Sequence, residues 1–293
     1  MSKRFFATTL LSALFGLLFL IACARPSPTP TPAASELNTI IASTDLAVGQ
    51  NRFVFAILDN ERRAIKEQEV TAAFFLDTKP QPEPGEVVKA TFRPWPASVA
   101  GVYTTNVTFD ISGIWSVRVT VPGEDSRQPA PAFFEVKERT SAPSLGTPPP
   151  ASRNKTARDV AKLEEITTAH PPDPDLYQMT VAEAIKSGKP TLITFATPAF
   201  CLSATCGPQV DVVQKLKDRY RDKANFIHIE IWDNPEEMQG DLSKGRISPI
   251  VEEWALITEP FTFLVNRDGL VAAKFEGFTT GEELETALLT LMQ

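Results

Sequence analysis

Residues 191–206 read TLITFATPAFCLSATC and contain two of the chain's three cysteines, Cys201 and Cys206. The first five residues form a continuous β-type run, which is typical of a central strand buried on both faces. After Cys206, apolar residues recur at helical spacing as far as Tyr220. The stretch therefore predicts a buried strand, a cysteine-bearing turn and a helix in succession.

The flanking sequence continues this alternation of helix and strand. Residues 180–187 begin with Thr180 and carry Glu183 three residues later, which is the capping-box pattern of a helix start. The elements predicted downstream are a strand at 226–231, a hairpin formed by strands 261–265 and 270–275 around the turn 266–269, and a final helix at 280–292. Together they indicate an α/β domain.

This order of elements resembles the thioredoxin fold over about 110 residues, from Val181 to the C-terminus. Glu259-Pro260 looks like the cis-proline segment of that family, in which the proline faces the cysteines. The resemblance implies thiol–disulfide exchange, in which Cys201 attacks a substrate disulfide and Cys206 resolves the mixed disulfide. It also implies that Pro260 and Glu259 contact the substrate and that the reaction needs no cofactor.

The spacing of the two cysteines departs from the family, because four residues separate them where thioredoxins have two. In a straight helix, Cα atoms five residues apart are separated by roughly 8.6 Å. A disulfide needs less than about 7 Å. If the two cysteines are bonded, Cys201 must therefore precede the helix in a loop or bulge.

The sequence does not decide at which residue that helix begins. Gly207-Pro208 suits an N-cap followed by proline at the first helical position, which would leave both cysteines in the loop. A start near Ser203 would instead place Cys206 in the first turn. Residues 206–209 also resemble the family's Cys-Gly-Pro-Cys motif with its second cysteine lost, but the spacing to neighbouring elements favours Cys206 as the second cysteine.

Other family positions differ as well. Thr194 stands where thioredoxins carry a buried aspartate, and Phe200 replaces the tryptophan before the first cysteine. His228, on the following strand, is a candidate to approach the cysteines from below, although a lone histidine on a strand is more often a packing residue. His228 and His170 are the only histidines, too few for most transition-metal sites, and we predict no metal centre.

The N-terminal residues 1–22 have the features of a secretory signal, with a basic head at Lys3 and Arg4 and an apolar run up to Ala22. The ending Leu-Ile-Ala-Cys at residues 20–23 resembles the lipobox of bacterial lipoproteins, and this resemblance implies that Cys23 is lipidated. A single transmembrane helix is the alternative, since the run approaches the roughly 18-residue minimum. We expect a lipid-anchored protein on the extracytoplasmic side of the cell membrane, where disulfides persist.

Proline-rich segments divide the mature chain. We predict a tether at 23–34, a β-domain at 35–138, a linker at 139–156 and the thioredoxin-like domain at 157–293. The strands expected in the β-domain lie near residues 39–43, 51–58, 70–76, 87–92, 102–109, 115–121 and 133–136. Their number and the Gly113-x-Trp115 pattern resemble immunoglobulin-like sandwiches of exported bacterial proteins. This segment contains no His or Met, which excludes the copper binding of some relatives.

The charge composition of the chain limits the kinds of molecule that it is expected to bind. Removing Lys3 and Arg4 with the signal changes the formal charge from −7 to −9, which argues against nucleic acid as a partner. The expected partners are exported protein substrates, or an assembly partner, and the membrane through the lipid on Cys23. Three functions stay open: a thiol–disulfide oxidoreductase, a non-catalytic binding module with a structural disulfide, and, with least support, copper delivery.

Overall fold

The computed structural model describes residues 37–77, 84–96, 100–123 and 128–293. The predicted signal segment, the lipidation site Cys23 and the tether at 23–34 lie outside these residues. Within the described ranges, none of the helices is both long enough and apolar enough to cross a lipid bilayer.

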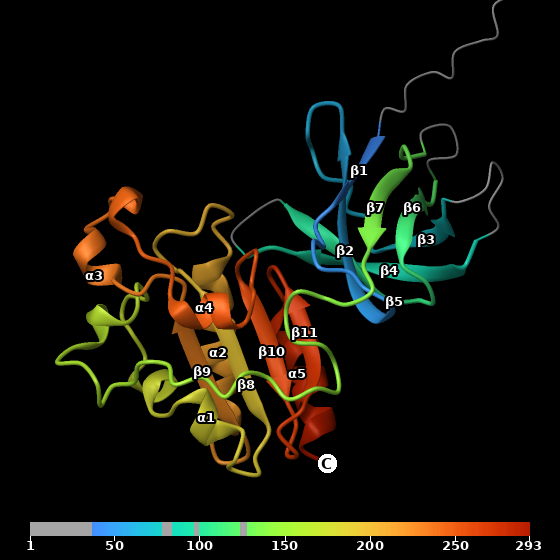
Figure 1. Cartoon of the computed structure of the whole chain (residues 1–293). Helices are drawn as coiled ribbons and strands as arrows, with labels where there is room; N and C mark the ends of the chain where they lie inside the picture. The colour runs from blue at the N-terminus through green and yellow to red at the C-terminus, as the bar shows by residue number, and fades with distance from the viewer. Residues whose placement is uncertain (1–36, 78–83, 97–99, 124–127) are drawn as a thin grey trace, which may run out of the picture. The chain divides into compact units, whose positions relative to one another are not determined.

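Residues 37–136 form an antiparallel sheet whose described strands follow the order β1-β2-β5-β4-β3-β6-β7 (Figure 1). The bounds are β1 Leu37–Ile41, β2 Gly49–Asp59, β3 Glu69–Leu76, β4 Glu86–Pro94, β5 Gly101–Phe109, β6 Gly113–Thr120 and β7 Ala132–Val136. Each strand overlaps one that the sequence predicts, so the prediction of a β-rich region ahead of the α/β region is confirmed.

The core of this sheet follows from the alternation of side chains along its strands. In β6, Trp115, Val117 and Val119 are all buried, as a period of two requires for a strand with one face inward. On the inner face, the rings of Phe53 and Phe74 meet edge to face with centroids 4.9 Å apart. Burial of these large rings contributes to the apolar core that stabilises the region.

The α/β region contains a second sheet, ordered β11-β10-β8-β9 (Figure 1). Its described elements are α1 Val181–Ala184, β8 Thr191–Ala196, α2 Cys206–Tyr220, β9 Asn225–Glu230, α3 Pro235–Met238, α4 Pro249–Glu253, β10 Phe261–Val265, β11 Val271–Glu276 and α5 Gly281–Leu291, with short 3-10 helices η1 Leu163–Glu165, η2 Pro174–Tyr177 and η3 Leu242–Lys244. Strands β8 and β9 are parallel, whereas β10 is antiparallel to both β8 and β11.

This topology is that of the thioredoxin fold. A parallel pair needs a long crossover, and helix α2 provides it between β8 and β9. The hairpin β10–β11 turns at Gly269, whose φ of +76° suits glycine. The all-buried strand β8 confirms the prediction made from its continuous β-type run. Helix α1 is shorter than the predicted 180–187, because the chain continues as turns up to Gly188.

Residues 139–156, predicted as a linker, pack closely against both regions. The amide N–H groups of Ser141 and Ala142 donate to the Asp45 carboxylate over 2.7 and 3.0 Å. Further along, Gly146 and Thr147 exchange backbone hydrogen bonds of 2.8 and 2.9 Å with Val271 on β11. The segment is therefore an ordered part of the structure rather than a free spacer.

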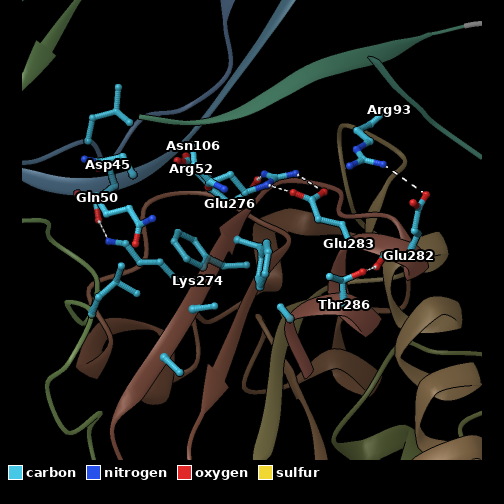
Figure 2. Close-up of a pocket in the computed structure, with 18 residues that line it drawn as sticks. Asp45, Gln50, Arg52, Arg93, Asn106, Lys274, Glu276, Glu282, Glu283 and Thr286 are labelled. Carbon is cyan, nitrogen blue, oxygen red and sulfur yellow. Dashed lines mark hydrogen bonds and ion pairs between the residues drawn. The ribbon is translucent and has the colours of Figure 1, made fainter. Parts of the chain in front are cut away.

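Direct contacts also join the β-rich and α/β regions, and residues 35–293 form one compact unit. The Arg52 guanidinium on β2 pairs with both carboxylate oxygens of Glu283 on α5, over 2.6 and 3.0 Å (Figure 2). Both side chains are largely buried, and the two-pronged geometry orients them. The β-rich region thus contacts α5 and the end of β11.

Candidate functional site

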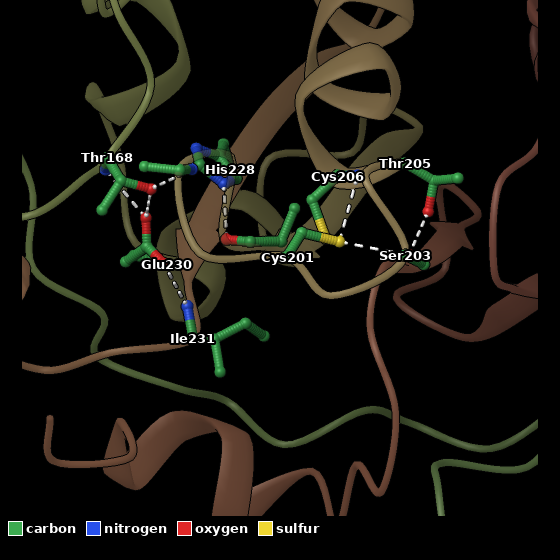
Figure 3. The surroundings of a disulfide bond; sticks show 10 residues. Thr168, Cys201, Ser203, Thr205, Cys206, His228, Glu230 and Ile231 are labelled. Carbon is green, nitrogen blue, oxygen red and sulfur yellow. Dashed lines mark hydrogen bonds between the residues drawn. A yellow bond between two sulfur atoms is a disulfide. The ribbon is translucent and has the colours of Figure 1, made fainter. Parts of the chain in front are cut away.

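Cys201 and Cys206 form a disulfide with a Cα–Cα separation of 5.8 Å (Figure 3). Cys206 is the first residue of α2, and Thr205 is its N-cap. Cys201 lies in the loop between β8 and α2, as the geometric argument from the five-residue spacing requires. Cys206 therefore sits in the first turn, and the alternative in which both cysteines precede the helix is wrong. The helix begins at Cys206, between the two starts that the sequence leaves open.

The two sulfurs lie in different environments. Cys206 is fully buried, whereas Cys201 is partly exposed and is followed by Leu202, which is 93% exposed. The Cys201 sulfur accepts the amide N–H of Cys206 at 3.3 Å and lies 3.2 Å from the Ser203 hydroxyl. After reduction, these donors and the N-terminus of α2 would stabilise a thiolate on Cys201. Cys201 thus carries the more accessible sulfur of the pair.

Thr194 gives the site no acid, as the sequence indicates. Its side chain is completely buried on β8, and its hydroxyl lies 3.0 Å from the Thr262 hydroxyl on β10. Two threonine hydroxyls in mutual contact satisfy each other's hydrogen bonding, and neither can accept a proton at neutral pH.

Glu230, the last residue of β9, is a buried acid that the sequence interpretation missed. Its carboxylate accepts the amide and hydroxyl of Thr168, both at 2.8 Å, and the amide of Ile231 at 3.1 Å (Figure 3). Burial raises its pKa to about 7. Parallel pairing sets Glu230 opposite Ala196, where β8 ends and the cysteine loop begins. An acid at the end of a strand rich in apolar β-branched and aromatic residues was the available signal.

His228 is a buried packing residue, in line with its default interpretation. Its Nε2 donates to the Ala196 carbonyl at 3.1 Å, and the Tyr177 hydroxyl donates to its Nδ1 at 2.7 Å. Burial lowers its pKa to about 4, so the ring is neutral at pH 7. With both ring nitrogens occupied, His228 holds the end of β8 beneath the cysteine loop.

Glu259 is brought directly to the cysteines. One of its carboxylate oxygens and the sulfurs of Cys201 and Cys206 all lie within 4.8 Å of one another. The side chain is partly buried, and burial raises its pKa. The next residue, Pro260, is buried and follows a cis peptide bond. The predicted residues Cys201, Cys206 and Glu259 therefore meet at one place, and Pro260 adjoins it.

These three donor atoms are also the group that could ligate a metal ion. While the sulfurs are bonded to each other they offer no thiolates, so a metal could bind only after reduction. Two thiolates and one carboxylate would suit a soft or borderline ion. Nothing in the arrangement requires one, and the sequence-based prediction of no metal site stays a prediction.

Comparison with known proteins gives limited information. No protein-family model matches the chain, and no curated protein does. Among solved structures, a thioredoxin-family thiol:disulfide interchange protein from Chlorobium tepidum is 15% identical, with a TM-score of 0.32, over 39% of this chain and 86% of its own. StoA from Bacillus subtilis is 19% identical, with a TM-score of 0.28, over 34% and 82%. A DsbF homologue from Corynebacterium diphtheriae is 17% identical, with a TM-score of 0.32, over 39% and 77%. At these scores the likenesses carry no argument, and the fold assignment rests on strand order and helix placement.

Proposed function

We propose that this protein is a membrane-anchored, extracytoplasmic thiol–disulfide oxidoreductase that acts on exported proteins through Cys201 and Cys206. The observation that carries the proposal is the asymmetry of the pair. A partly exposed sulfur that accepts two hydrogen bonds is joined to a fully buried sulfur at the first residue of α2. A purely structural disulfide has no need of an accessible sulfur flanked by thiolate-stabilising donors.

The chemistry proceeds in two exchanges. The reduced Cys201 thiolate attacks one sulfur of a substrate disulfide, and the other substrate sulfur leaves as a thiolate. Cys206 then attacks the Cys201 sulfur, which closes the protein disulfide and releases the second substrate thiol. The substrate gains two electrons and the Cys201–Cys206 pair loses two. An external dithiol must reduce the pair before the next cycle.

The proposal includes the location and the role of the N-terminal half. The signal-like residues 1–22 and the lipobox-like ending support lipidation of Cys23 and an extracytoplasmic position. We infer that the β-rich region is an immunoglobulin-like sandwich that holds the redox region away from the membrane. The order β1-β2-β5-β4-β3-β6-β7 supports this inference, because it keeps the neighbours expected in the two sheets of that fold.

Metabolic labelling with radioactive palmitate tests the anchor. The wild-type chain is expected to incorporate the label and to fractionate with membranes, whereas Cys23→Ala is expected to do neither. A Cys201→Ala chain serves as the cysteine control and should label normally. Labelling that survives loss of Cys23 would overturn this assignment.

The redox proposal is tested by the reduction potential of the Cys201–Cys206 pair in the full chain. Alkylation and mass spectrometry across a series of redox buffers give the potential and the reactivity of each cysteine. We expect a potential above roughly −270 mV, with Cys201 alkylated faster than Cys206. A potential below about −300 mV with two unreactive cysteines would instead support a binding module with a structural disulfide.

A further inference from the structure

The Glu259 carboxylate lies near both sulfurs. In the part of the chain that the structure describes, it has no other polar partner. An oxygen of this carboxylate lies within 4.8 Å of the sulfur of Cys201 and of the sulfur of Cys206. Among the described residues, its side chain makes no ion pair or hydrogen bond. A partly buried carboxylate without such a partner costs free energy, which suggests that another use accounts for its position.

The exchange chemistry creates a need for a base at this place. Cys206 must lose its thiol proton before it can attack Cys201, because only a thiolate is an effective nucleophile. Its sulfur belongs to a fully buried residue, so bulk water has poor access to this proton. The protein itself must therefore supply the acceptor.

The other ionisable groups near the cysteine loop are already occupied. Glu230, at the end of β9, accepts three hydrogen bonds from Thr168 and Ile231. His228, on the same strand, uses one ring nitrogen to donate and the other to accept. Thr194, the residue at the family's aspartate position, is a hydroxyl paired to Thr262. Glu259 is left as the available carboxylate.

We propose that Glu259 is a catalytic residue that accepts the thiol proton of Cys206 when the mixed disulfide is resolved. This inference rests on the proposed function and assigns a proton path to its second step. It gives Glu259 a role beyond the substrate contact that the thioredoxin resemblance implies. It also explains how a chain with threonine at position 194 can carry out this step.

Protons and charge balance over the reaction cycle when Glu259 carries the transferred proton. The reduced site holds one negative charge, on the Cys201 thiolate, with Glu259 and Cys206 protonated. Attack on the substrate disulfide moves the charge to the first leaving sulfur, and Glu259 loses its proton to that sulfur or, where the leaving thiolate is weakly basic, to water. The carboxylate then accepts the Cys206 proton, and the new thiolate attacks Cys201. The second leaving sulfur takes that proton, so the cycle ends with a disulfide, two substrate thiols and an ionised Glu259.

The electrostatics of the site agree with this order of events. Burial raises the pKa of Glu259, which makes it a stronger base than an exposed carboxylate. A thiolate on Cys201 at this short distance disfavours a second negative charge, so Glu259 keeps its proton at the start. Formation of the mixed disulfide removes that charge and frees the carboxylate to ionise.

The test is a single turnover of the reduced full chain with 5,5′-dithiobis(2-nitrobenzoate), which releases one coloured thiolate on attack and a second on resolution. With Glu259→Gln, we expect a first phase close to the wild-type rate and a second phase slowed about a hundredfold at pH 7. Because the variant depends on ionisation of Cys206 itself, its second phase should recover as the pH rises toward 10. Glu259→Asp should restore part of the rate at pH 7.

Glu252→Gln, an exposed substitution on α4, is the matched control and should leave both phases unchanged. A second phase in Glu259→Gln that equals the wild type, or that is slowed equally at every pH, would overturn the proton-transfer role alone. Absence of a first phase in the wild type would overturn the proposed function, and this inference with it.

Discussion

Replacing Cys201 by serine is expected to lower the rate of thiol–disulfide exchange by about a thousandfold or more, because the only accessible nucleophilic sulfur of the pair is lost. Cys206→Ser should behave differently. Its Cys201 sulfur can still attack, but the mixed disulfide cannot be resolved internally and should accumulate. Non-reducing gel electrophoresis and mass spectrometry of each variant, mixed with a disulfide-containing protein, would show the trapped species.

The two variants are matched controls for each other, because both lose the same disulfide. Any difference between them therefore reports the chemistry of the sulfurs rather than the loss of a crosslink. Under the proposed function, attack belongs to Cys201, because its sulfur is partly exposed and accepts hydrogen bonds from Cys206 and Ser203. Trapping by Cys201→Ser and not by Cys206→Ser would reverse the assigned roles. Trapping by neither variant would favour the binding module.

Between pH 4 and pH 8, the free energy of unfolding of the wild type is expected to fall by about 3 kcal/mol relative to that of Glu230→Gln. The reason is that the pKa of Glu230 rises from 4.5 to about 7 on folding. Between these two values the folded chain binds more protons than the unfolded chain. Stability contributed by the protonated group is therefore lost as the pH rises through this window. Above about pH 7, the difference between wild type and variant should become constant.

Urea denaturation of both proteins across this pH range measures the difference directly. His228 contributes a slope of the opposite sign, since burial lowers its pKa to about 4 and the folded state loses stability as the pH falls below 6.5. That slope is present in both proteins and cancels in the comparison. A flat difference for Glu230→Gln would mean that folding does not raise the pKa of Glu230.

The order of elements could be predicted because the spacing of apolar residues along the chain distinguishes helices from strands. The continuous run of residues 191–195 corresponds to β8, and the helical spacing after Cys206 corresponds to α2. The capping box at Thr180 is also present, with the Thr180 hydroxyl accepting the Glu183 amide at 3.1 Å. Local signals were weaker at the start of α2, where Gly207-Pro208 and Ser203 both offered credible helix starts. In the structure, the helix begins between these two positions, at Cys206.

Local periodicity gave no such signal for the acids around the disulfide: Glu230 was missed, and Glu259 was expected beside the cysteines only through the thioredoxin resemblance. Glu230 and Glu259 are separated from Cys201 by 29 and 58 positions in the chain. They come close only because β9 pairs with β8 and because the segment before β10 ends beside the cysteine loop. Sequence spacing carries no information about such neighbours until the order of strands in the sheet is known.

The sequence by itself determined the type of each main element, and it placed Cys201 ahead of the helix if the cysteines are bonded. Both follow from short-range geometry: side-chain periods of two or 3.6 residues, and the distance between residues five apart in a helix. Only the tertiary structure decided which sulfur is exposed, which carboxylate faces the pair, and that residues 139–156 are packed. Those properties depend on contacts between distant segments, and such contacts arise when the sheet assembles and excludes water from its two faces.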